Sequence, residues 1–103
     1  MYENEGQYDE NMNIRRHRQP ATGLLEWTVQ LHYGGGSVDT TSPPITQAQC
    51  DDLRAKSGNV ANFSSAAASY FGTTWWNSLT SLAVPNGQPA WQEAVRLDFA
   101  VAP

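Results

Sequence analysis

The sequence predicts a small α+β protein in which an antiparallel sheet carries its helices on one face. Two segments with apolar residues at every second position, 24–33 and 95–101, indicate strands with one buried face. Between them, a helix-start signal at Thr46 and an alanine-rich run at 66–68 indicate two helices. The expected order of elements is β-α-α-β-β, preceded by an extended N-terminal arm.

The N-terminal arm, residues 1–20, is expected to have no fold of its own. Acidic residues are followed by a basic run, and the apolar residues fit neither helical nor strand spacing; they are Met1, Tyr2, Tyr8, Met12 and Ile14. Such a segment cannot bury enough apolar surface to offset the entropy of ordering it. We therefore divide the chain into an arm at 1–20 and a single α+β domain at 21–103. Deletion of the arm is expected to leave the domain folded.

The first strand is expected over 24–33, where apolar side chains alternate with polar ones. The apolar set is Leu25, Trp27, Val29, Leu31 and Tyr33. Residues 34–44 follow as a predicted loop, because three glycines and two prolines oppose both a helix and a strand ladder.

The first helix is expected to begin after Thr46, because Gln49 three residues later completes a capping box. Ile45 before the cap and Cys50 in the first turns have the spacing of a hydrophobic staple. Gly58 is the expected C-terminal cap of this helix.

A second, short helix is expected within residues 59–72, capped by Asn62 or Ser64 and stopped by Gly72. The next segment is open to two interpretations, a third helix from Thr73 to Leu82 or a strand over roughly 78–84.

The strand over 78–84 is preferred because a Pro-Asn-Gly turn at 85–87 then leads to the predicted strand at 95–101. In that last strand Val95, Leu97, Phe99 and Val101 face the core.

Composition limits the function. The chain has 103 residues, a formal net charge of −4 and a pI of about 4.9, which disfavours nucleic acid as a partner. Lys56 is the one lysine, so there is no polybasic membrane patch, and Cys50 has no internal disulfide partner. No signal peptide and no apolar run of about 20 residues is visible, which is compatible with the expected location, a virion or the host cytoplasm.

The sequence offers no catalytic, cofactor or metal motif. It lacks paired Cys/His zinc spacings, a G-x-S-x-G turn and a phosphate-binding glycine loop. His32, Cys50, Asp51 and Asp52 resemble metal ligands by type, but they read better as an exposed histidine, a staple cysteine and a helix-start acid pair. We therefore expect no enzyme activity, no cofactor and no metal.

Partner contact is assigned instead to the arm and to the tryptophans. Aromatic residues are enriched at binding hot spots, and arginines bind acidic grooves. The predicted partner-binding residues are Tyr2, Tyr8, Met12, Ile14, Arg15, Arg16, Arg18, Trp75, Trp76 and Trp91.

We therefore expect a non-catalytic assembly protein, such as a bacteriophage head, head–tail connection or tail component, whose arm orders on a neighbouring subunit. Its partners would be copies of itself or other assembly proteins. A small regulatory or inhibitory protein that binds one host partner is the alternative. A third interpretation is a small enzyme or ligand-binding domain with its site in the loop Gly34–Pro44, near His32 and Asp39.

Overall fold

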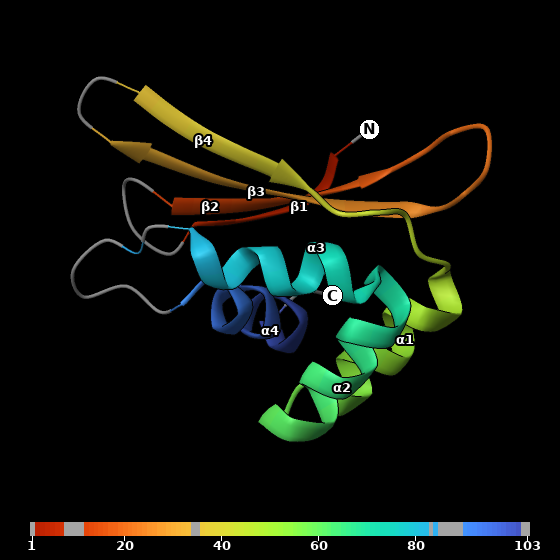
Figure 1. Ribbon diagram of the computed structural model, residues 1–103. Helices are drawn as coiled ribbons and strands as arrows, with labels where there is room; N and C mark the ends of the chain where they lie inside the picture. The colour runs from red at the N-terminus through yellow and green to blue at the C-terminus, as the bar shows by residue number, and fades with distance from the viewer. Residues whose placement is uncertain (1, 8–11, 34–35, 83, 85–89, 102–103) are drawn as a thin grey trace.

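The computed structural model describes residues 2–7, 12–33, 36–82, 84 and 90–101, and these form a helical layer on one face of a sheet (Figure 1). The strands are β1 (Tyr2–Gln7), β2 (Met12–Arg18), β3 (Leu25–Tyr33) and β4 (Gly36–Thr41). The helices are α1 (Gln47–Lys56), α2 (Val60–Phe71), α3 (Thr73–Ser78), the short 3₁₀ helix η1 (Leu79–Ser81) and α4 (Trp91–Val101).

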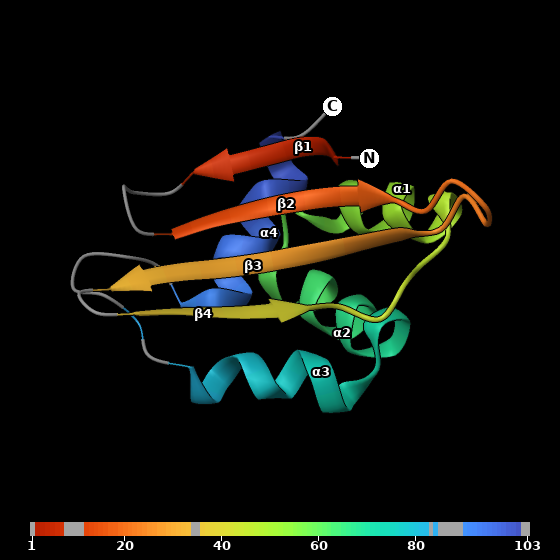
Figure 2. The ribbon, with the colours of Figure 1, turned by 90° about the horizontal axis from the view of Figure 1, so that it is seen from above.

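The strands follow one another across the sheet in the order β1-β2-β3-β4, and each neighbouring pair is antiparallel (Figure 2). The predicted α+β class, with an antiparallel sheet and helices on one face, is confirmed. The order of elements differs from the prediction, because all described strands precede all described helices.

β3 confirms the strand predicted over 24–33. Leu25, Trp27 and Val29 are fully buried, as their alternation predicts. Trp27 lies at the centre of the core, stacked on Phe99 at 4.8 Å between ring centroids and edge-on to Phe71 at 5.7 Å.

β2 corrects the prediction that residues 1–20 form an arm separate from the domain. Residues 12–18 are extended, as expected, but they pair with β3 from Met12 opposite Leu31 to Arg18 opposite Leu25. The ladder satisfies the backbone polar groups, and Ile14 is fully buried in the core. The boundary at residue 20 therefore does not separate β2 from the sheet.

β4 corrects the prediction of a loop over 34–44. Val38, Thr40 and Thr41 are β-branched, which suits the extended backbone opposite β3. Beyond β4, the Ser42 hydroxyl accepts a hydrogen bond from the backbone N–H of Trp27 at 2.9 Å, which continues the attachment to β3. Residues 34 and 35 of the predicted loop lie outside the described residues.

The start of α1 is as predicted. The Thr46 hydroxyl accepts from the Gln49 N–H at 3.1 Å, and the Gln49 side-chain oxygen accepts from the Thr46 N–H at 2.9 Å. Ile45 and Cys50 are both buried. The predicted cap at Gly58 is wrong, since Ser57 ends the helix by donating its backbone and hydroxyl hydrogens to the Arg54 carbonyl.

The start of α2 lies earlier than predicted. Asn59, and not Asn62 or Ser64, is the N-cap, because its side-chain oxygen accepts from the Asn62 N–H at 2.9 Å. The helix ends at Gly72 as predicted, where φ is +92°, a backbone conformation that favours glycine.

Both strands predicted in the C-terminal third are wrong. Residues 73–81 are helical, which is the alternative interpretation, because Trp75, Trp76 and Leu79 share a buried helical stripe. Residues 91–101 form α4, whose buried face includes Trp91, Ala94, Val95 and Phe99 at helical spacing. The predicted turn at 85–87 lies outside the described residues.

Candidate functional site: the N-terminal strands and the open face of the sheet

In the described part of the chain, helices cover one face of the sheet and none covers the other, which we call the open face (Figure 1). Side chains on the open face alternate with the buried ones of β2, β3 and β4. The described set is Asn13, Arg15, His17, Glu26, Thr28, Gln30, Asp39 and Thr41, and all are half-buried or exposed. The open face is therefore polar and carries charges of both signs.

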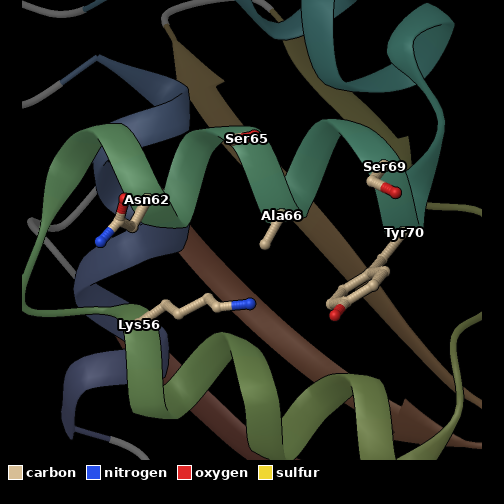
Figure 3. Close-up of a pocket in the computed structure, with 6 residues that line it drawn as sticks. All are labelled: Lys56, Asn62, Ser65, Ala66, Ser69 and Tyr70. Atoms are coloured by element: carbon tan, nitrogen blue, oxygen red, sulfur yellow. The ribbon is translucent and has the colours of Figure 1, made fainter.

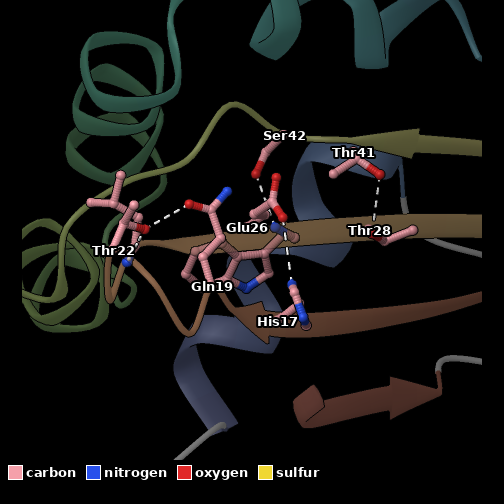
Figure 4. Close-up of polar contacts among 9 residues, drawn as sticks. His17, Gln19, Thr22, Glu26, Thr28, Thr41 and Ser42 are labelled. Carbon is pink, nitrogen blue, oxygen red and sulfur yellow. Dashed lines mark hydrogen bonds and ion pairs between the residues drawn. The ribbon is translucent and has the colours of Figure 1, made fainter. Parts of the chain in front are cut away.

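Cross-strand pairs hold the open face together (Figure 4). His17 Nδ1 lies 3.5 Å from Glu26 Oε1, and the hydroxyls of Thr28 and Thr41 are 3.1 Å apart. These contacts are exposed or partly exposed, so each contributes less than about 1 kcal/mol. They order the surface without closing it to a partner.

β1 forms one edge of the sheet, with β2 as its strand neighbour (Figure 2). In the register of the two strands, Glu5 lies opposite Arg15 and Asn4 lies opposite Arg16, with an irregularity between Tyr2 and Asn4. An edge strand presents a row of backbone N–H and C=O groups to which another strand can pair. This edge is the first candidate contact for a partner.

The predicted basic cluster is divided between two faces and one end of β2. Arg15 and His17 lie on the open face, whereas Arg16 is buried on the helical side with 7% of its surface exposed. Arg18 donates to the Gly23 carbonyl at 3.0 Å and to the Gln47 side-chain oxygen at 2.6 Å. The arginines therefore do not form the single basic patch that was predicted to bind an acidic groove.

Burial, rather than the nearby Arg16, disfavours nucleophilic chemistry at Cys50. Burial raises the pKa of Cys50, although Arg16 and Arg54 oppose this by their positive charges. The thiol is fully buried and free of disulfide bonds. A buried, protonated thiol is a structural group.

The predicted apolar contacts of the arm lie in different environments. Ile14 is in the core, so it is unavailable to a partner while β2 is paired. Tyr2 and Met12 belong to β1 and β2, but their side chains are outside the described ones, and Tyr8 lies outside the described residues altogether.

The three tryptophans assigned to partner binding are core residues, which corrects the expected aromatic surface. Trp75, Trp76 and Trp91 are 9%, 2% and 1% exposed. Trp75 donates its indole N–H to the Thr40 hydroxyl at 2.9 Å, and Trp76 donates to the Ser64 hydroxyl at 3.2 Å. The two adjacent tryptophans are both buried because Trp75 contacts β4 and Trp76 contacts α2.

A pocket of about 310 Å³ lies between α1 and α2 (Figure 3). It is lined by Lys56, Asn62, Ser65, Ala66, Ser69 and Tyr70. Beside it, Asp52 Oδ2 accepts from Lys56 Nζ at 2.6 Å and from the Tyr70 hydroxyl at 2.5 Å.

The hydrogen bonds from Lys56 and, less strongly, Tyr70 lower the pKa of Asp52. Their hydrogen bonds to Asp52 raise the pKa values of Lys56 and Tyr70 in turn. The Lys56 charge is thus neutralised within the protein, and the network joins two helices rather than preparing a general base.

The described residues include no group of three or more His, Cys, Asp or Glu side chains that could hold a metal ion. Within the same residues, no helix is long and apolar enough to cross a membrane. Of the alternative site near the loop Gly34–Pro44, Asp39 is exposed on β4, and the His32 side chain is outside the described ones.

Sequence reasoning missed the open face and the Asp52 network. Part of the open face could have been predicted, because the polar positions of the predicted strand 24–33 include Glu26, Thr28 and Gln30. The pairing of Asp52 with Tyr70 spans 18 residues and two helices, and no local pattern signals it.

Comparisons with models of protein families, with curated proteins and with solved structures found no match to this chain.

Proposed function

We propose that this chain is a non-catalytic assembly protein, a structural component of a bacteriophage particle such as a head, head–tail connection or tail protein. In this proposal β1 binds a neighbouring subunit. The observation that carries it is the edge position of β1 beside β2. The small size, the net charge of −4 and the single lysine support the same class by composition.

The sequences of the two strands support a separable β1. Of the six residues of β1, Tyr-Glu-Asn-Glu-Gly-Gln, only the tyrosine has a large apolar side chain. β2 pairs on both sides and places Ile14 in the core. Removal of β1 therefore breaks one ladder of backbone hydrogen bonds, whereas removal of β2 breaks two ladders and also removes core contacts. This narrows the expected arm from residues 1–20 to the first strand.

Light scattering after size-exclusion chromatography tests the proposal, with the intact chain and a variant lacking residues 1–7 compared across concentration. At the highest loading, about millimolar, the intact chain is expected to give a mass above that of the monomer. Deletion of residues 1–7 is expected to lower this mass, and an unchanged far-UV circular dichroism spectrum would show that the variant is still folded. Thr80→Lys, a charge change at an exposed position of η1, serves as the control and should leave the mass unchanged.

A monomer in both forms at every concentration would contradict assembly. That result would favour the second candidate, a small regulatory or inhibitory protein that binds one host partner. The hollow of about 150 Å³ next to Val60, which is 59% exposed, supports this candidate as a place for one apolar side chain of a partner.

A further inference from the structure

The two N-terminal strands differ in the sign of their charged residues, and one acidic residue lies opposite a basic one in their register. β1 contains Glu3 and Glu5, and β2 contains Arg15, Arg16 and Arg18. The register places Glu5 opposite Arg15, which is a favourable cross-strand combination. β2 is therefore a complementary template for the sequence of β1.

That template is equally complementary to β1 of another copy. Every pair in the β1–β2 ladder would be the same whether the two strands belong to one chain or to two. Exchange of an identical element is a low-cost route to an oligomer, because it requires no new surface. The sequence connection between β1 and β2 is four residues, 8–11, so a closed hairpin has an effective concentration of about millimolar and prevails in dilute solution.

Direct pairing of two β1 edges is a weaker arrangement. It would bring Glu3 and Glu5 of one copy close to the same two residues of the other, and like charges across a ladder are destabilising. Exchange keeps Glu5 opposite Arg15. The charge pattern thus selects a second copy's β2, rather than its β1, as the binding site.

We propose that β1 of one copy pairs with β2 of a second copy in the β1–β2 register described above, and that this strand exchange is how copies join. The inference rests on the proposed assembly function and adds its mechanism. It requires a high local concentration, such as that within an assembling particle, because only then does the intermolecular ladder compete with the closed hairpin.

Disulfide trapping between two different variants tests the exchange. One chain carries Glu5→Cys and the other carries Arg15→Cys, and the two are refolded together at millimolar concentration and then oxidised. Facing residues of antiparallel strands lie within disulfide distance, so a covalent heterodimer forms only if β1 of one chain lies on β2 of the other. Gln30→Cys on β3, paired with Glu5→Cys, is the control, because β2 lies between those strands.

The expected result is a heterodimer band on non-reducing gels for positions 5 and 15, at least fivefold stronger than for positions 5 and 30. Natural Cys50 is buried and does not compete. A single chain with both Glu5→Cys and Arg15→Cys reports the closed hairpin as a cross-linked monomer. If the double variant assembles but yields only cross-linked monomer on oxidation, strand exchange is wrong and the assembly function still stands. Failure to assemble at all would overturn both.

Discussion

Two segments with the same alternating pattern adopt different structures, β3 near the start of the chain and α4 at its end. Apolar residues stand at every second position in both 25–33 and 95–101. β3 is a strand that buries Leu25, Trp27 and Val29, whereas α4 buries Ala94 and Val95 together and leaves Leu97 half-buried. Four alternating apolar residues are therefore insufficient to distinguish a strand from a helix.

The flanking residues explain the difference. Trp91 and Ala94 precede the alternating part of α4, and with Val95 and Phe99 they complete a stripe at helical spacing. Helix-forming residues are frequent in this segment, while β3 is rich in β-branched and aromatic residues. β3 also has a strand on each side to pair with, which α4 lacks.

Deletion of residues 1–20 tests the dependence of β3 on its neighbour and is expected to have the largest effect. It removes β2 and with it Ile14, whose burial alone is worth about 3 kcal/mol, out of a typical total of about 5–15 kcal/mol. Cooperative urea unfolding, followed by tryptophan fluorescence, should be lost. Deletion of 1–7 should keep a cooperative transition at a lower midpoint. Cooperative unfolding after the longer deletion would show that residues 21–103 fold alone.

Aspartate substitutions in α4 distinguish a helix from a strand there. Ala94→Asp places a carboxylate in the core and should cost about 3 kcal/mol or more of unfolding free energy. Leu97→Asp, at a half-buried position, should cost no more than about half of that, and Ala100→Asp on the exposed face should cost least. Urea denaturation of the three variants gives the order. A larger cost at 97 than at 94 would restore the strand.

The smallest expected effect is on the pH dependence of stability in acid, and it comes from the Asp52 contact between α1 and α2. Since the folded pKa of Asp52 is lowered, its contribution to stability is present above the unfolded value near 3.8 and is lost as pH falls through the folded value. Asp52→Asn should therefore flatten the decline of the urea midpoint below about pH 4. Tyr70→Phe removes one of the two donors and should give an intermediate slope. Equal slopes in all three proteins would mean that the network does not contribute.

The candidate site was predictable only where it depended on local pattern. The acidic and basic halves of residues 1–20 are evident in the sequence, and they become β1 and β2. The burial of Trp75, Trp76 and Trp91 was not evident, because it depends on how α3 and α4 pack against the sheet. The exposure of a side chain depends on the residues that pack around it after folding, so composition alone wrongly assigned these side chains to a binding surface.

Local chemistry in the sequence determined the fold class, β3, the capping box of α1 and the end of α2 at Gly72, because each depends on residues within a few positions of one another. Tertiary structure decided β2 and β4, and it selected the helical pattern over the alternating one in 91–101, where the sequence contains both. β2 and α4 each bury a charged residue, Arg16 and Asp98, which interrupts the apolar pattern that would otherwise identify them. A charged side chain tolerates burial only when distant parts of the chain surround it with polar groups, and no local pattern contains that information.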